Sequence, residues 1–107
     1  MKQWDIFLFP FTEEQSHPVV ILSIDERAAA RKHVNGLICV TLRGRPPGLH
    51  EVLLDKADGL DWESVVRCDL IHLLERGRFL ERRGRVIPER QIQISRKLIE
   101  SFRLRTY

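Results

Sequence analysis

Five short apolar runs, separated by turn-forming residues, limit what this chain of 107 residues can fold into. The runs are rich in β-branched and aromatic residues and span 4–11, 18–23, 37–42, 50–55 and 63–69. Runs of this length and composition predict strands, most of them buried. The segment DLIHLLE (69–75) either continues the fifth strand or forms a sixth. So many short strands predict a sheet that bends or closes on itself.

Two segments have the pattern of helices. Residues 25–33 begin with acidic and end with basic side chains, which suits the dipole of a short exposed helix. Residues 88–102 begin with proline and carry one predicted stripe of Ile92, Ser95, Leu98, Ile99 and Phe102. We therefore expect a mainly β fold, a small antiparallel barrel or strongly bent sheet, with a short helix and a C-terminal helix. Residues 1–107 are expected to form one domain.

Charged side chains are distributed unevenly along the chain. Residues 1–64 carry seven basic and ten acidic side chains, a net charge of −3. Residues 65–107 carry eleven basic and five acidic ones, a net charge of +6. Most of this second basic set is arginine, whose guanidinium group suits phosphate oxygens. The second half therefore indicates a polyanionic partner, either nucleic acid or an acidic peptide, or else a solvated charged surface.

Several other classes of protein lack support in the sequence. The apolar run at the start is too short for a signal peptide or a membrane span, and we expect a cytoplasmic protein with no membrane contact. The four histidines and two cysteines lack the spacing of a metal site, and we expect neither metal nor cofactor. Cys39 and Cys68 lie in strand-like runs, where two buried thiols are expected in place of a disulfide.

The stretch VVRCD (65–69) carries the most specific chemical pattern. In a strand, Arg67 and Asp69 emerge on one face, and Val66 and Cys68 on the other. A solvated ion pair with no function is the commonest explanation of such spacing. A guanidinium and a carboxylate fixed side by side on a rigid strand are also what an active site needs. The spacing alone leaves both explanations open.

The order of several segments resembles the MazF/PemK family. The segments are WDIFLF, HPVVILS, ICVTL, GLDWESVVRCDLI and RRGRVIPERQIQISRKLIESFRL. Members of this family are the toxins of bacterial type II toxin–antitoxin systems and share a CcdB-like barrel fold. VVRCD is similar to the Kid-like branch, in which the arginine and aspartate of this segment are implicated in RNA cleavage. The resemblance covers nearly the whole chain.

The resemblance implies a metal-independent endoribonuclease, an mRNA interferase that cleaves single-stranded RNA and arrests growth. It also implies a homodimer and a cognate antitoxin whose acidic, disordered tail occupies the RNA groove, with operator DNA bound only through that antitoxin. Arg67, Asp69 and His17 are the catalytic candidates. The charge pattern adds the RNA-binding candidates Arg43, Arg45, Arg76, Arg78, Arg82 and Arg83, and the resemblance adds Thr41. For Arg67 we expect stabilisation of the phosphorane charge, because guanidinium holds its proton far above neutral pH.

Two departures from the family pattern bear on activity. The second strand begins with His17-Pro18, where arginine–proline is usual, and a histidine can supply the acid or base at neutral pH. The third strand has Thr41 one residue earlier than the usual substrate-facing hydroxyl, with Leu42 in its place. A shift of one residue turns a side chain to the opposite face unless a bulge restores the register. An inactive module that binds only antitoxin or RNA, or a CcdB-like gyrase poison, is therefore the alternative function.

Overall fold

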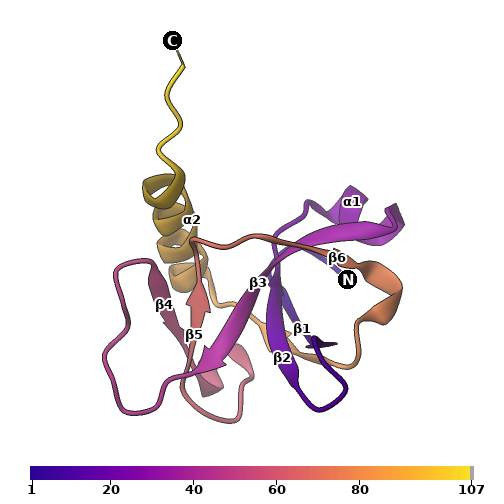
Figure 1. Cartoon of the computed structure of the whole chain (residues 1–107), viewed down its shortest axis with the longest axis horizontal. Helices are drawn as coiled ribbons and strands as arrows, with labels where there is room; N and C mark the ends of the chain where they lie inside the picture. The colour runs from indigo at the N-terminus through magenta and orange to yellow at the C-terminus, as the bar shows by residue number, and fades with distance from the viewer. Residues whose placement is uncertain (107) are drawn as a thin grey trace.

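The computed structural model describes residues 1–106, and these form a strongly curled antiparallel sheet with a C-terminal helix against one face (Figure 1). The order along the chain is β1 (Asp5–Pro10), β2 (Ser16–Ile21), α1 (Asp25–Ala30), β3 (His33–Thr41), β4 (Glu51–Leu54), β5 (Ser64–Arg67), β6 (His72–Glu75), β7 (Arg82–Arg85) and α2 (Pro88–Phe102), with short 3₁₀ turns η1 (Lys56–Asp58) and η2 (Arg76–Arg78). The expectation of a mainly β fold with a short helix and a C-terminal helix is confirmed.

The long strand β3 organises the sheet. The strands follow the order β4-β5-β3-β2-β1-β7, and β6 pairs with β3 outside this path. The first half of β3 pairs with β6 and its last residues pair with β5, so β5 and β6 lie end to end along one edge of β3. The segment 69–75 therefore includes a sixth strand and does not simply prolong the fifth.

The two faces of the sheet have different coverings. On the face termed here the helix face, Val20, Cys39 and Val66 pack with Ile94 of α2 in the main core. The opposite face is termed the outer face. Along β1, β2 and β6 the outer face is covered by two small hydrophobic clusters, one around Phe9 and the other around Ile21. Figure 1 shows α2 beside β4 and β5 at one end of the sheet, and α1 near β6 at the other.

The helix α2 has the predicted bounds but faces the sheet with a different stripe. Ile94 is fully buried, whereas Ile92 is 54% exposed and Ile99 is 73% exposed. The stripe toward the sheet runs through Arg90, Ile94, Leu98 and Ser101, at the spacing of successive helical turns. The predicted stripe is confirmed at Leu98 and wrong at Ile92, Ile99 and Phe102, which are exposed. Two of the four inward positions are polar and bind partners at η1 and just before β4.

The start of α2 is held by a carboxylate from another element. Ile87 offers no side-chain cap, but its backbone N–H donates to Asp58 Oδ1 at 3.0 Å. Arg90 reaches back to Asp55 and to Asp58, whose side chain is fully buried. The backbone donor at the N-cap of α2 therefore finds its acceptor on η1.

The two cysteines lie where the sequence placed them. Cys39 and Cys68 are free thiols buried in the core, so the prediction of two buried thiols is confirmed. Within residues 1–106, no helix is both long enough and apolar enough to cross a membrane.

Candidate active site

Arg67 and Asp69 form an ion pair at the end of β5. Nε of Arg67 lies 3.2 Å from Oδ1 of Asp69, and Nη2 lies 3.3 Å from Oδ2, so two parallel hydrogen bonds join the groups. The side chains are 41% and 34% exposed. The pair predicted from the VVRCD spacing therefore exists in the structure, and solvent can reach both members.

The pair lies where the strand leaves the sheet. Between the pairs Cys39–Val66 and Gly36–His72, β3 has two residues and the opposite strand has five, so three residues leave the ladder. Continuing the β5 register opposes Arg67 to Ile38, which makes Asp69, Leu70 and Ile71 the extra residues. Leu70 and Ile71 are accordingly 46% and 42% exposed. Such an insertion re-aims side chains, and here it brings Asp69 back toward the guanidinium of Arg67.

The electrostatics of the site favour an ionised carboxylate. Hydrogen bonding from Arg67 holds the pKa of Asp69 below its usual range, and the charges of Arg67 and His50 act in the same direction. Asp69 in turn raises the pKa of Arg67. Glu51, which pairs with Arg67 across the β4–β5 ladder, binds Arg45 with Nη1–Oε1 and Nη2–Oε2 distances of 2.7 and 3.0 Å. Two guanidinium–carboxylate pairs therefore lie side by side at this edge.

His17 lies on the same face as Arg67 but does not contact it. Val19 pairs with Ile38, so His17 belongs to the outer face, opposite the continuation of β3 at Val40. Two strand spacings and two residues along the strand separate His17 from Arg67, about 12 Å between Cα atoms on a flat sheet. Its ring packs edge-on against Phe11, with 5.8 Å between centroids. His17 therefore makes no direct contact with Arg67 or Asp69, with which the sequence predicted it to converge.

A polar pocket of about 240 Å³ contains three of the predicted residues, His17, Thr41 and Arg83. Hydroxyl-bearing side chains from three strands, Ser16, Thr41 and Ser64, also line it. Thr41 pairs with Ser64 in an unbroken register from Cys39 onward. No bulge therefore restores the shifted position, and Thr41 lies on the helix face, away from Arg67.

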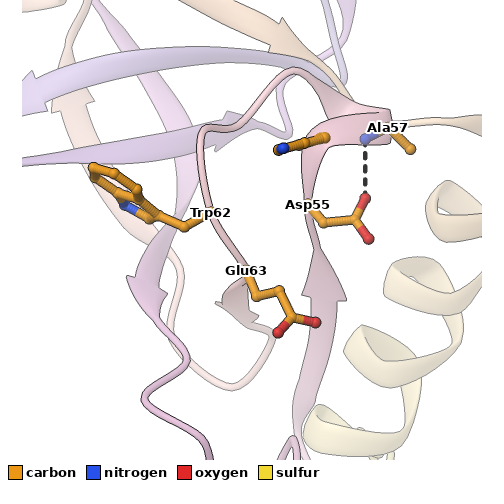
Figure 2. Close-up of a pocket in the computed structure, with 5 residues that line it drawn as sticks. Asp55, Ala57, Trp62 and Glu63 are labelled. Carbon is orange, nitrogen blue, oxygen red and sulfur yellow. Dashed lines mark hydrogen bonds between the residues drawn. The ribbon is translucent and has the colours of Figure 1, made fainter.

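Trp62 is the largest exposed side chain near this pocket. It is 67% exposed and lines both this pocket and a second hollow beside Asp55 and Glu63. Figure 2 shows its indole pointing away from the turn in which Asp55 accepts the backbone N–H of Ala57. Its exposure assigns Trp62 to the surface and not to the core.

Most of the predicted RNA-binding arginines have partners within the chain. Arg45 binds Glu51, Arg82 binds Asp5, and Arg83 binds Asp61 and Glu81. Arg76 donates to the carbonyl of Arg31, and Arg78 donates to the carbonyl of Pro10. Arg43 is exposed on the loop after β3. The partners of Arg83 are exposed, so a phosphate can compete with them, whereas Glu51 and Asp5 are each only 10% exposed and hold their arginines more firmly.

The sequence reasoning missed several neighbours of the site. Ser16, Ser64, Trp62 and Glu51 carry no motif, and only the strand register brings them beside the predicted residues. Among residues 1–106, no cluster of three or more His, Cys, Asp or Glu side chains could hold a metal ion.

Solved structures of toxins and their complexes have the same fold. The chain superposes on an endoribonuclease in complex with its cognate antitoxin from a mycobacterial species with a TM-score of 0.83 and 19% identity, covering 100% of this chain and 99% of that one. For the Mycobacterium tuberculosis toxin MazF-mt6 the TM-score is 0.79 at 21% identity, covering 95% and 99%. For a MazE–MazF complex from Deinococcus radiodurans it is 0.77 at 18% identity, covering 98% and 97%.

The family assignment comes from the sequence itself. A search of curated proteins gave no match. The model of the PemK-like, MazF-like toxins of type II toxin–antitoxin systems matches residues 2–102, which is nearly the whole chain. The chain belongs to this family of toxins.

Proposed function

We propose that this protein is a metal-independent endoribonuclease that cleaves single-stranded RNA as the toxin of its toxin–antitoxin pair. The carrying observation is the two-point Arg67–Asp69 contact, which is exposed at a break in the sheet. Family membership and the fold shared with solved toxins support the same activity. The whole described chain would act as one domain, in the cytoplasm where its RNA substrates are.

The proposed chemistry begins with a change of partner at Arg67. A phosphate dianion or diester offers the guanidinium the same planar pair of oxygens as a carboxylate does. When the scissile phosphate takes that position, Asp69 is released from its hydrogen bonds while remaining ionised. It is then free to accept the proton of the 2′-hydroxyl as that oxygen attacks phosphorus. Arg67 meanwhile stabilises the negative charge that develops on the phosphorane oxygens.

The substrate strand would extend from this corner along the outer face. His17 lies further along the same face and would contact the adjoining nucleotide, with Arg43 and Arg45 nearby on the loop after β3. Neutralising several phosphates makes binding weaken as salt rises. Arg76, Arg78, Arg82 and Arg83 would contact nucleotides beyond the central ones, whereas Thr41, on the helix face, would be reached only by a nucleotide that enters the polar pocket. Exposed Trp62 offers a surface for base stacking.

An antitoxin would inhibit the enzyme by covering the same surface. The mycobacterial neighbour was solved with its cognate antitoxin, and the Deinococcus neighbour as a MazE–MazF complex. An acidic, disordered tail of such a partner would compete with phosphates for the exposed arginines. We further propose that the toxin acts as a homodimer and meets operator DNA only through its antitoxin.

One observation favours an inactive binding module as the second candidate. Thr41 lies on the helix face, and the β3 residues Ile38 and Val40 separate His17 from Arg67. A protein with an incomplete site would bind RNA or antitoxin without cleaving RNA.

The deciding experiment incubates the purified toxin, separated from any antitoxin, with single-stranded RNA in EDTA. Cleavage that Asp69→Asn abolishes and His17→Ala weakens is the expected result. Asp25→Asn, an exposed aspartate near α1, is the matched control and should leave cleavage unchanged. Binding of varied RNAs without cleavage by the parent protein would favour the binding module.

A further inference from the structure

Three hydroxyl-bearing side chains form one row across the helix face of the sheet. Thr41 of β3 pairs with Ser64 of β5, and continuing the β2–β3 register opposes Thr41 to Ser16 on its other side. Neighbouring strands lie about 4.8 Å apart, so the three hydroxyls stand side by side on β2, β3 and β5. The next row toward the main core is apolar and includes Leu8, Pro18 and Cys39. The helix face therefore changes from core to polar surface within two residues along each strand.

These two rows line the polar pocket of about 240 Å³, together with Trp62 and Arg83. Ser64 is buried, whereas Trp62 is 67% exposed and the side chain of Arg83 is 30% exposed. The pocket therefore leads from an apolar wall and a buried hydroxyl to an indole and a guanidinium that solvent can reach. Small ligands commonly bind at the mouth of a curled or closed sheet, which is the position of this pocket.

The polar groups of the pocket are available to a ligand. Oγ of Ser64 lies 3.4 Å from the carbonyl oxygen of Trp62, which is long for a hydrogen bond between two oxygens. Thr41 and Ser16 are exposed. Arg83 contacts the carboxylates of Asp61 and Glu81, and both of these are more than half exposed. A phosphate can therefore take their place on the guanidinium.

Three properties of the pocket together indicate the ligand that it suits. An exposed indole beside an apolar wall suits a flat aromatic ring, which stacks on tryptophan. Hydroxyl groups both donate and accept, so they pair with a ring edge that carries carbonyl and amino groups. A guanidinium suits phosphate oxygens. A nucleotide combines a planar base of this kind with a phosphate.

We propose that this pocket binds one nucleotide, with the base stacked on Trp62, its edge toward the hydroxyls of Ser64 and Thr41, and its phosphate on Arg83. The nucleotide comes either from an RNA strand or from solution as a mononucleotide. For an RNA strand the inference rests on the proposed function, and for a mononucleotide it stands alone.

The pocket and the Arg67–Asp69 pair are separate sites. Arg67 and Ser64 both belong to β5 but are three residues apart, so their side chains lie on opposite faces of the sheet. Binding at the pocket can therefore be measured in Asp69→Asn, in which the proposed cleavage is blocked. Binding and cleavage can then fail independently.

Trp62 supplies the signal for the first measurement. The other tryptophan, Trp4, packs against the main core, away from the residues that line the pocket. Titration with adenosine 5′-monophosphate or uridine 5′-monophosphate should quench the fluorescence of the parent protein in a saturable way. Trp62→Phe should lose most of this quenching. Isothermal titration calorimetry should show that the phenylalanine variant still binds, because phenylalanine also stacks on a base.

Variants of the lining residues test the assigned base contacts by calorimetry. Trp62→Ala should weaken mononucleotide binding about 10-fold or more, because it removes the stacking surface. Thr41→Val keeps the shape of the side chain and removes its hydroxyl, so it should weaken binding several-fold. Each variant should keep the circular dichroism spectrum and the unfolding transition of the parent. A folded Trp62→Ala protein with the affinity of the parent would contradict the assigned stacking.

The phosphate contact is tested by comparing a nucleotide with its nucleoside. The parent should bind adenosine 5′-monophosphate about 10-fold more tightly than adenosine. Arg83→Gln should bind the two equally, with the affinity of the parent for adenosine. Arg83→Lys repeats the comparison if the glutamine variant is unstable. Arg96→Gln, which changes an exposed arginine of α2, is the matched control and should keep the preference of the parent.

A short single-stranded RNA added to Asp69→Asn distinguishes the two sources of the nucleotide. If an RNA nucleotide occupies the pocket, the RNA should quench Trp62, and excess adenosine 5′-monophosphate should compete with it. If the RNA binds without changing the Trp62 signal while mononucleotides still quench it, the ligand is a free mononucleotide.

The remaining outcomes overturn the inference without touching the ribonuclease function. The pocket is not a nucleotide site if neither RNA nor millimolar mononucleotide gives saturable quenching. The same conclusion follows if Arg83→Gln and Thr41→Val leave the quenching unchanged. A parent protein that cleaves RNA but shows no binding at Trp62 retains the proposed function and loses only the pocket.

Discussion

Two arginine–aspartate contacts in this molecule join the same chemical groups in different surroundings. Arg67 and Asp69 meet at the surface, two residues apart in sequence, and both are substantially exposed. Arg90 instead joins α2 to η1, where it contacts Asp55 and the fully buried carboxylate of Asp58. In the proposed reaction a phosphate replaces the carboxylate of the first contact. The second contact cannot be exchanged in this way, because Asp58 also accepts the backbone N–H groups of Asp55 and Ile87.

The buried contact is distinguished by how completely its acceptor is used. Asp58 accepts from the backbone N–H groups of Asp55 and Ile87, each at 3.0 Å, as well as from Arg90. These bonds connect the turn after β4 to the start of the C-terminal helix. Removing a partner leaves buried charge without compensation, and this is costly. An arginine–carboxylate pair that is buried and has many hydrogen-bond partners therefore indicates a structural role. An exposed pair with few partners indicates that one partner can be exchanged for a ligand.

The largest effect is expected from breaking the buried contact. Asp58→Ala should lower the free energy of unfolding by about 3–5 kcal/mol, because it leaves two backbone donors without an acceptor and removes one of the two carboxylates that bind Arg90. Chemical denaturation followed by circular dichroism measures this. Asp61→Ala, three residues further on and exposed, removes a partner of Arg83 and should cost at most about 1 kcal/mol. Equal losses for the two variants would contradict the distinction.

Breaking the exposed contact should have the opposite effect, with little loss of stability and a large loss of RNA cleavage. Arg67→Ala should change stability by less than about 1 kcal/mol, while RNA cleavage should fall about 100- to 1000-fold through loss of charge stabilisation. Arg67→Lys should recover little, because an ammonium cannot form the two-point contact. Cleavage assays and denaturation of the same samples test both statements. Arg96→Ala, on α2, is the control, and a stability loss in Arg67→Ala as large as in Asp58→Ala would refute the comparison.

A third change tests how closely the buried region is packed. A Cβ added to Gly84 of β7 would lie 2.0 Å from the carbonyl oxygen of Asp58, so one of the two segments must move. Gly84→Ala should therefore destabilise the fold by about 2–3 kcal/mol. Gly77→Ala, where a Cβ meets nothing within 4 Å, should stay within about 0.5 kcal/mol of the parent. Thermal unfolding distinguishes them, and similar melting temperatures would show that β7 can separate from η1.

The same contrast explains which parts of the fold were predictable from the sequence. β-branched runs predicted β1, β2, β4 and β5 within two residues, because burial of apolar strands is local information. The first four residues of β3, which pair with β6, were missed because they lack such a run. β7 has the sequence RRGR, with no apolar residue, and its position depends on pairing with β1 and on Gly84 against η1. The inward stripe of α2 was missed for a related reason. Arg90 and Ser101 face inward because of Asp58 and His50, which lie far away in sequence.

The candidate site was predictable only in part. The spacing of Arg67 and Asp69 predicted a pair, but the three residues that leave the ladder after Arg67 have no sequence signal. The side on which Thr41 lies depends on an unbroken register with Ser64, and the sequence left that register open. Residues brought together by tertiary contacts require the structure, whereas residues close in one strand do not.

The smallest expected effect is the change in stability when Asp69 of the exposed pair is protonated at low pH. Because Arg67 lowers the pKa of Asp69 in the folded protein, the pair stabilises the fold above the usual aspartate pKa of about 3.9. That contribution should be lost as pH falls through the lower, folded value. Since both groups are exposed, it should amount to at most about 1 kcal/mol. The stability difference between the parent and Asp69→Asn should therefore be small at pH 6 and vanish in strong acid. A difference of several kcal/mol would mean that Asp69 supports the fold as Asp58 does, and its release by a phosphate would then be too costly for the proposed reaction.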